Sequence, residues 1–232
     1  MINAHSESEY LYRGLRALVG FRLQTWKSWL RHGHFIRSRA IARYLASNAV
    51  VKVHLGATHN TPGFLNSQVC GEIPIDISAP LPFPDASIDL LYSSHVVEHL
   101  HRLQFREFLV ESMRVLKPGG LNIMATPSLG KIISVLYGSD QAARETLLGR
   151  GARFSSEPFH TAGQQINITM RAFGHRWLYD REYMTNIGQL VGFRRVDVIG
   201  NTDLPDDGLR EYVRQRKPAA WDLETETYVF EK

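Results

Sequence analysis

Val50-Val-Lys-Val-His-Leu-Gly-Ala57 is the stretch of this 232-residue chain that decides its fold. Its β-branched and apolar residues predict a short buried strand of a parallel sheet, and Gly56 predicts a tight turn where that strand ends. In doubly wound sheets, ligands bind beyond the carboxyl ends of the strands, where glycine lets the backbone approach them closely. We therefore expect a ligand-binding turn at residues 56–58.

Two further segments continue the same pattern. The sequence Leu81-Pro-Phe-Pro-Asp85 predicts a rigid, extended loop, because each proline fixes its own φ and disfavours helix in the residue before it. Ile88–Tyr92 predicts a second buried strand. Ser93-Ser94-His95 follows at its carboxyl end, where polar residues are expected to face a cleft.

A helix and a third strand come next. Apolar residues at helical spacing predict one helix from Val96 to Leu116, which ends at Lys117-Pro-Gly-Gly120. Leu121–Ala125 predicts the strand that follows. Later in the chain we expect a helix at Asp180–Val191, a strand at 193–199 and a last strand at 224–230.

These pieces, in this order, resemble the small bacterial S-adenosylmethionine-dependent methyltransferases usually called type 11. The resemblance covers about residues 50–127 and is most specific from LPFPD to KPGG. It implies an α/β, Rossmann-like, doubly wound and mostly parallel sheet with an antiparallel last strand. It also implies S-adenosylmethionine as the cofactor.

The resemblance also implies where the cofactor lies. Asp76 matches the acidic position beside the adenine. At two points the chain differs from the family: Gly56-Ala57-Thr58 stands where Gly-x-Gly is usual, and the amide of Asn66 stands near the usual ribose-binding acid. The residues expected to contact the cofactor are His54, Gly56, Ala57, Thr58, Asn66, Asp76, Ile77, Ser93, Ser94 and His95.

His99 is the expected general base, since a neutral imidazole can accept a proton near physiological pH. Glu98 would orient it. In the structural alternative, Glu98 only favours a helix N-terminus and His99 packs on a neighbouring loop. His160 is a third candidate catalytic residue, expected to contact the substrate. His101 is expected to face solvent.

A metal hypothesis also arises here, because His95 and His99 are four residues apart, as zinc-binding pairs on one helical face are. The predicted helix begins near Val96, however, so His95 lies outside it. We therefore expect no metal.

Residues 138–180 are expected to form an insertion or substrate cover, loop-rich over 138–165 with a short helix at 141–148. In one interpretation His160, Asn167 and His175 line an acceptor pocket. In the alternative, Asp180 caps the next helix while Trp177 and Tyr179 fill the core.

Composition limits the remaining choices. One cysteine, Cys70, excludes an intramolecular disulfide framework and a cysteine-based zinc cluster. We expect a cytoplasmic protein, because the sequence has neither a membrane-spanning apolar run nor a signal peptide. Residues 49–232 are expected to be the methyltransferase domain.

Residues 1–48 are expected to be a basic, amphipathic helical extension. They carry a net charge of +6, which leaves −2 for the rest. The extension could pack on its own domain, form a homodimer, or contact a membrane surface through residues 10–45. We expect no nucleic-acid partner, because the rest of the chain is slightly acidic and has no recognised nucleic-acid motif.

The sequence therefore predicts a methyltransferase that acts on a small molecule or a sugar-bearing (glycan) acceptor, at oxygen because histidines populate the expected cleft. Two alternatives stay open: a scaffold protein of the same fold that binds the cofactor weakly or not at all, and a same-fold enzyme that catalyses a cyclisation or rearrangement.

Overall fold

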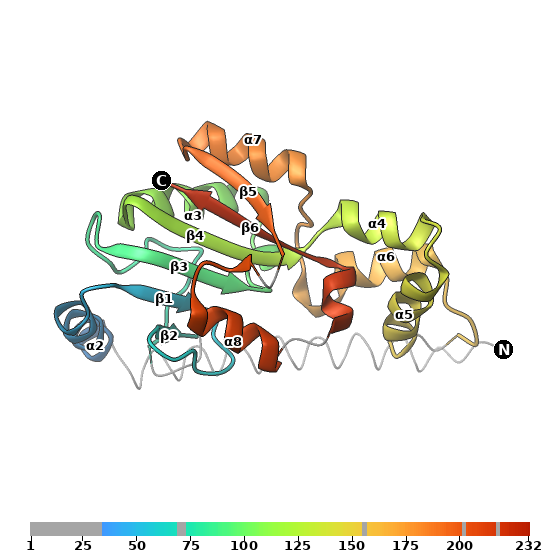
Figure 1. The fold of residues 1–232 in the computed structure, drawn as a ribbon, viewed down its shortest axis with the longest axis horizontal. Coiled ribbons are helices and arrows are strands. Elements are labelled where there is room, and N and C mark those ends of the chain that lie inside the picture. Colours follow the sequence, from blue (N-terminus) through green and yellow to red (C-terminus); the bar gives the residue numbers. More distant parts are fainter. Residues whose placement is uncertain (1–33, 69–72, 155–156, 201–202, 217–218) are drawn as a thin grey trace.

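The computed structural model describes residues 34–68, 73–154, 157–200, 203–216 and 219–232 (Figure 1). The strands are β1 Lys52–Leu55, β2 Leu65–Ser67, β3 Ile88–Ser94, β4 Leu116–Pro127, β5 Arg195–Ile199 and β6 Thr225–Glu231. The helices are α2 His34–Ser47, α3 Arg102–Val115, α4 Leu129–Tyr137, α5 Gln141–Ala152, α6 Ala162–Arg171, α7 Arg181–Val191 and α8 Asp207–Arg216, with 3₁₀ turns η1 Val97–His99, η2 Ala172–Gly174 and η4 Ala219–Leu223. Most of the expected extension, residues 1–33, lies outside the described residues.

The six strands form one sheet in the order β2-β1-β3-β4-β6-β5. β1 is parallel to β2 and β3, and β3 is parallel to β4. β6 is antiparallel to both of its neighbours, β4 and β5. This confirms the predicted Rossmann-like sheet with an antiparallel last strand.

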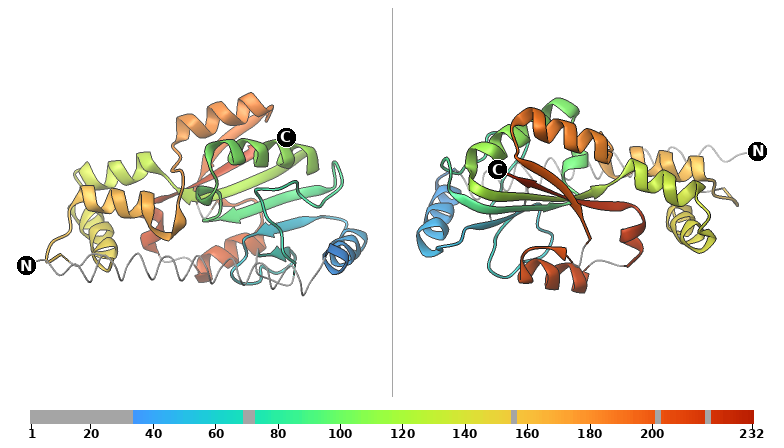
Figure 2. Two further views of the ribbon diagram at one scale, coloured as in Figure 1. Left: turned by 180° about the vertical axis from the view of Figure 1, so that it is seen from behind. Right: turned by 45° about the horizontal axis from the view of Figure 1, so that its top comes forward.

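Each face of the sheet carries its own hydrophobic cluster. On one face, Val53, Leu91 and Tyr228 of the sheet pack with α3 and α7. On the other, Tyr92, Ile123 and Val229 pack with α8 and the residues before it. Neighbouring strand residues such as Leu91 and Tyr92 therefore face opposite helical layers. Figures 1 and 2 show these layers, with α3 and α7 on one side of the sheet and α8 on the other.

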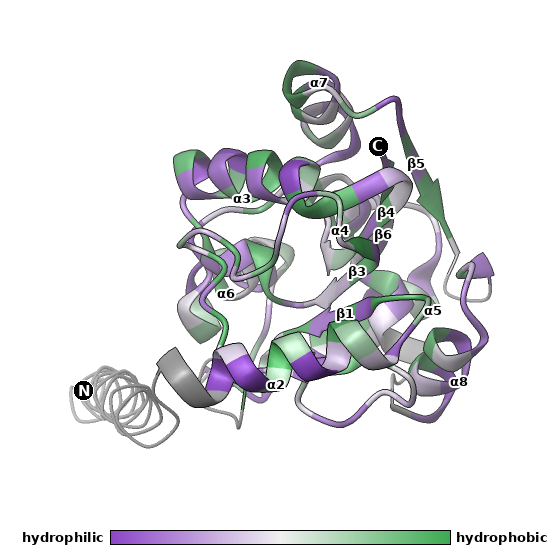
Figure 3. Ribbon diagram, turned by 90° about the vertical axis from the view of Figure 1, so that its left-hand side faces the viewer, coloured by the Kyte–Doolittle hydropathy of each residue, from purple (hydrophilic) through white to green (hydrophobic). Residues whose placement is uncertain are grey.

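The helix predicted over 96–116 is broken, and this part of the prediction is wrong. η1 ends at Leu100, which is extended (φ −89°, ψ 145°), and α3 begins two residues later. The carbonyl of Glu98 accepts from the backbone N of Arg176 at 2.8 Å, so it is not used to continue a helix. α3 itself is amphipathic, with hydrophilic and hydrophobic residues alternating along it (Figure 3).

The region predicted as loop-rich is largely helical, so that expectation is also wrong, although the helix expected at 141–148 is confirmed by α5. α4, α5 and α6 bury a small cluster of their own that includes Ile132, Leu136, Leu147 and Ala162. They lie beyond the end of β4, at one end of the sheet (Figures 1 and 2). We call α4, α5 and α6 the helical unit. The boundaries of the insertion remain a prediction.

The segment that leads into α7 fills the core in part. Asp180 Oδ1 accepts from the backbone N of Tyr183 at 2.8 Å, which confirms the helix cap. Tyr179 is fully buried, but Trp177 is 40% exposed, so only the tyrosine fills the core. Among the described residues, no helix has the length and apolar character needed to span a bilayer.

Candidate active site

The turn after β1 is shaped by glycine. Gly56 has φ +71°, and a Cβ added to it would overlap Cγ2 of Val96, in the segment that follows β3. The backbone N of Ala57 donates to the carbonyl of Ser67 at 2.8 Å, which holds the turn at the end of β2. Thr58 is exposed, and its hydroxyl lies 3.2 Å from Nδ1 of His59. The three predicted cofactor residues therefore lie at the carboxyl edge of the sheet, and Gly56 lies directly beside Val96.

Two buried serines end their strands at this edge, and their hydroxyls have no partner within the described part of the chain. Ser67 and Ser93 are each paired in register with Leu55 on the strand between them. Both are 1% exposed, and neither Oγ has a hydrogen-bond partner among the described residues. A buried hydroxyl without a partner costs roughly 1–3 kcal/mol, so the pair fits a polar ligand that binds at the strand ends. This arrangement fits the adenosyl cofactor that the sequence predicts.

Sequence reasoning named Ser93 but missed Ser67. The signal was its place at the end of the second strand, next to Asn66. The Asn66 amide is largely engaged within its own loop: its Oδ1 accepts from the backbone N of Thr61, and its Nδ2 donates to the carbonyls of Thr61 and Phe64. The hydroxyl of Ser67, rather than the amide beside it, is thus the unpaired polar group at this strand end.

The other predicted cofactor residues differ in their surroundings. Asp76 is exposed, and its Oδ1 accepts from both the backbone N and the hydroxyl of Ser78. Ile77, next to it, is buried. His54 is also buried, with Nδ1 2.8 Å from the Thr61 hydroxyl and its ring edge-on to two tyrosines. The structure therefore leaves the carboxylate of Asp76, but not the ring of His54, open to solvent.

His95 begins the segment that carries the acid and base candidates. Its φ is +56°, and its backbone N donates to the carbonyl of Ala125. Its Nε2 lies 3.2 Å from the Thr225 hydroxyl, and its ring centroid lies 4.2 Å from that of Trp221. A histidine in this left-handed conformation turns the chain sharply out of β3. Ser94, just before it, is half-buried.

Glu98 is the centre of the polar cluster. Its side chain is fully buried, and its Oε2 accepts from the Thr126 hydroxyl at 3.2 Å. Its Oε1 lies 3.3 Å from Nδ1 of His95 and 3.9 Å from Nε2 of His175. Burial raises the pKa of this carboxyl, but the hydrogen bond and charge of His95, a backbone hydrogen bond and the charge of His99 together outweigh it, so the pKa lies below its ordinary value. Glu98 is therefore a buried carboxylate at neutral pH.

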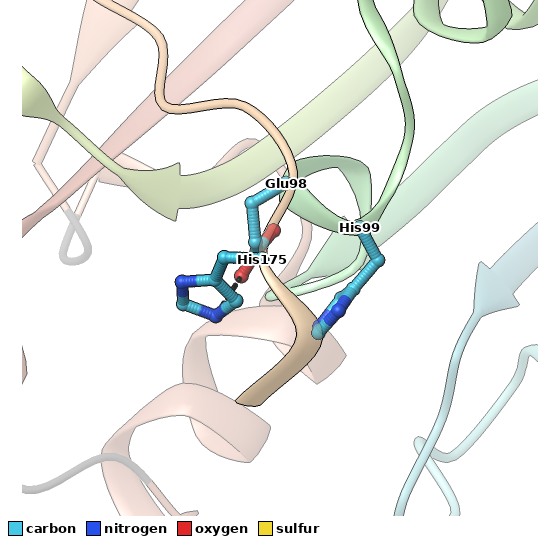
Figure 4. A group of neighbouring side chains, drawn as sticks. All are labelled: Glu98, His99 and His175. Carbon is cyan, nitrogen blue, oxygen red and sulfur yellow. Dashed lines mark ion pairs between the residues drawn. The ribbon is translucent and has the colours of Figure 1, made fainter. Parts of the chain in front are cut away.

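His99 and His175 lie on either side of this carboxylate (Figure 4). Their ring centroids are 5.1 Å apart. His99 Nδ1 lies 3.3 Å from the carbonyl of Gly174, and His175 Nδ1 lies 2.6 Å from the carbonyl of Thr169. Burial lowers the pKa of His175 below its ordinary value, and the charge of Glu98 only partly opposes this. His175 is thus a neutral imidazole at neutral pH.

His160 lies apart from this cluster, in the segment that leads into α6. Its Nε2 is 3.1 Å from Oε1 of Gln165, whose Nε2 donates to the Thr169 hydroxyl at 3.3 Å. Its Nδ1 is buried without a partner among the described residues. Through Thr169 and His175, the helical unit is connected by polar contacts to Glu98. His101 is exposed, as predicted.

A surface groove of about 440 Å³ lies elsewhere. It is lined by residues 77–80 and by the α3 side chains Leu103, Arg106, Glu107, Phe108, Val110 and Glu111. Of the predicted site residues it contains Ile77 alone. The groove is therefore not formed by the cluster around Glu98.

A family model described as a methyltransferase domain, Methyltransf_11, matches residues 40–124. Residues 40–124 are a class I S-adenosylmethionine-dependent methyltransferase domain. The predicted family is thereby confirmed for this part of the chain. The methyltransferase domain contains the Gly56 turn, both buried serines, Glu98 and His99, whereas His175 lies beyond the matched residues.

Two curated proteins are similar to parts of the chain. A probable S-adenosylmethionine-dependent methyltransferase of Mycolicibacterium smegmatis is 44% identical over 50 residues, which are 22% of this chain and 19% of that protein. The 24-methylenesterol C-methyltransferase 2 of Oryza sativa subsp. japonica is 38% identical over 94 residues, 37% of this chain and 24% of that one. The chain thus spans 19% and 24% of the length of these two relatives.

Solved structures were also compared. A SAM dependent methyltransferase from Archaeoglobus fulgidus is 16% identical, with a TM-score of 0.44, over 99% of this chain and 100% of that chain.

Proposed function

We propose that the protein is an S-adenosylmethionine-dependent methyltransferase that methylates a hydroxyl group of a small molecule or a sugar-bearing acceptor. The observation that carries the proposal is that a candidate cofactor site and a buried carboxylate lie close together at one edge of the sheet. The Gly56 turn and the unpaired hydroxyls of Ser67 and Ser93 lie at the strand ends. Val96, which packs against that turn, is two residues from the buried carboxylate of Glu98.

The contacts suggest which residues bind the cofactor and which act on the acceptor. S-adenosylmethionine, when bound, supplies a methyl group on a sulfonium, which an acceptor oxygen attacks as the carbon–sulfur bond breaks. The strand-end serines and the Gly56 turn are proposed to hold the cofactor, with Asp76 toward its adenosine. The chain's remaining task is to orient the acceptor and to remove its hydroxyl proton.

Glu98, His95, His99 and His175 are the groups proposed for that second task. A buried carboxylate next to imidazoles can stabilise the positive charge that forms on a ring when it takes the acceptor's proton. His99 is half-buried, so an acceptor can reach it from solvent. The rice relative is named as a C-methyltransferase, so it does not support an oxygen acceptor. The proposal that the acceptor atom is oxygen therefore rests on this histidine cluster.

The proposal is tested with S-adenosylmethionine carrying a labelled methyl group and fractions of hydroxylated small molecules and glycans. We expect labelled product whose label survives alkaline hydrolysis, as a methyl ether does. Glu98→Gln, which removes the buried charge, is expected to lower the rate at least tenfold, whereas His101→Ala, on the exposed neighbouring turn, is expected to retain it.

Label found on carbon would contradict the hydroxyl acceptor. Product formed without any added S-adenosylmethionine would instead support the cyclisation or rearrangement alternative. Absence of S-adenosylhomocysteine binding would refute the methyltransferase proposal and support the scaffold alternative.

A further inference from the structure

Glu98, His99 and His175 each place one possible ligating atom in a single small cluster. The three atoms lie within 4.8 Å of one another, and Glu98 Oε1 is 3.9 Å from His175 Nε2 (Figure 4). Glu98 and His99 come from η1, while His175 follows η2, about 75 residues later. The hydrogen bonds from Arg176 and Trp177 to the carbonyl of Glu98 hold these two segments together.

The partners of the two imidazoles decide which nitrogen is available. Nδ1 of each ring faces a backbone carbonyl, of Gly174 for His99 and of Thr169 for His175. A carbonyl only accepts, so each Nδ1 carries the hydrogen and each Nε2 keeps its lone pair. Metal-binding histidines almost always have this arrangement, in which the second ring nitrogen donates to a carbonyl or carboxylate.

The carboxylate lacks the partner that its burial demands. Glu98 is fully buried, yet Oε1 has no well-oriented hydrogen-bond donor among the described residues, although His95 Nδ1 lies 3.3 Å away. Within the described part of the chain, its ion pairs are with His95 and His175, and no lysine or arginine neutralises it. A buried negative charge close to two imidazole rings favours a cation among them.

We propose that Glu98, His99 and His175 bind a divalent transition-metal ion of the zinc class. Two imidazoles and one carboxylate are a ligand set that zinc uses in catalytic sites, where a further position stays open for water or substrate. The three ligating atoms must draw together from their present separations, because zinc–ligand bonds of about 2.0–2.2 Å place neighbouring ligand atoms closer than 3.9 Å. The half-exposed side chain of His99 can make that adjustment.

The pair considered from sequence, His95 and His99, is therefore replaced by a different set. His95 Nδ1 lies next to Oε1 of Glu98 and its Nε2 faces the Thr225 hydroxyl, so it supports the carboxylate from outside. His175 takes its place as a ligand. Its approach to Glu98 depends on the course of residues 172–177, which the spacing of the motif does not reveal.

The role of the ion rests on the proposed function, although the ion site itself does not. A bound ion with an open position would hold the acceptor hydroxyl and lower its pKa, so that His99 acts as a ligand rather than as the base. An acceptor with two adjacent oxygen atoms would suit such a site, because both can contact one ion.

The binding test uses the full chain, without a histidine tag and dialysed against a chelator, titrated with zinc chloride in a calorimeter. We expect one ion per chain. His99→Ala and Glu98→Gln should each weaken binding at least tenfold. His101→Ala is the matched control, since this exposed histidine is two residues from His99, and it should bind as the unmodified chain does.

Circular dichroism of each variant shows whether it is folded, and His99→Ala, which alters a half-exposed side chain, carries the test if Glu98→Gln does not fold. Absence of zinc binding, or equal binding by His99→Ala and His101→Ala, would overturn the proposal. S-adenosylhomocysteine binding, measured on the same samples, separates this site from the proposed function: zinc binding without nucleoside binding would refute the function and retain the ion site.

Discussion

At the scale of single residues, Gly56 is the position where the fold and the proposed cofactor site meet. Its φ of +71° is unfavourable for other residues, and a Cβ there would overlap Val96. The glycine therefore allows the first turn to pack against the segment that leads to Glu98. Any side chain at this point would push the two parts of the site apart.

We predict that Gly56→Ala lowers the free energy of unfolding by roughly 2–4 kcal/mol, because it adds backbone strain and a steric overlap. It should also weaken S-adenosylhomocysteine binding. The matched control is Gly130→Ala in α4, where a Cβ would meet nothing within 4 Å. Urea denaturation measures the free energy of unfolding of both variants. The account fails at this position if the two variants are equally stable.

At the scale of elements, one arginine joins α3 to the LPFPD loop. Arg114 donates to the carbonyls of Leu81 and Phe83 and forms ion pairs with Asp85 and Glu111. Its hydrogen bonds to Glu111 hold the pKa of that carboxyl below its usual range. The extended loop predicted from its prolines is thus fixed to the helix that follows the candidate base.

We predict that Arg114→Lys lowers the free energy of unfolding by about 1–2 kcal/mol, because an ammonium cannot reproduce the planar fork that serves two carbonyls at once. Arg106→Lys, on the exposed face of the same helix, should change it by less than about 0.5 kcal/mol. Thermal or urea unfolding of both variants checks this. Equal losses would mean that the fork does not stabilise the loop.

Five of the six strands were predicted from sequence, whereas β2 and two helical regions were not. The strand Ile88–Ser94 contains four apolar residues within five positions (Ile88, Leu90, Leu91 and Tyr92), which a local pattern reveals. The break between η1 and α3 depends on a hydrogen bond from Arg176 to Glu98, far away in sequence. The helical unit was missed because its core arises only where three short helices contact one another.

Some residues of the candidate site were likewise predictable from sequence, and others were not. Glu98, His99 and the Gly56 turn stand out in sequence because they follow strands. The contact between Glu98 and His175, in contrast, requires the chain to return from α6 to the sheet edge. Ser67 gave no sequence signal beyond its position, since a single serine at a strand end is common.

At the scale of the whole molecule, the carboxyl edge of the sheet joins the methyltransferase domain to the helical unit. Polar contacts run from His160 through Gln165 and Thr169 to His175 and Glu98. The helical unit lies at this end of the sheet, where a substrate cover would be expected (Figure 1). Both the proposed cofactor site and the histidine cluster thus belong to one region of the molecule.

The central claim, that this edge binds the adenosyl cofactor, is tested most directly by calorimetric titration of the full chain with S-adenosylhomocysteine. The account predicts one binding site with a dissociation constant in the micromolar range, weakened at least tenfold when Ser67 and Ser93 are both changed to alanine. No detectable binding at millimolar ligand would contradict it.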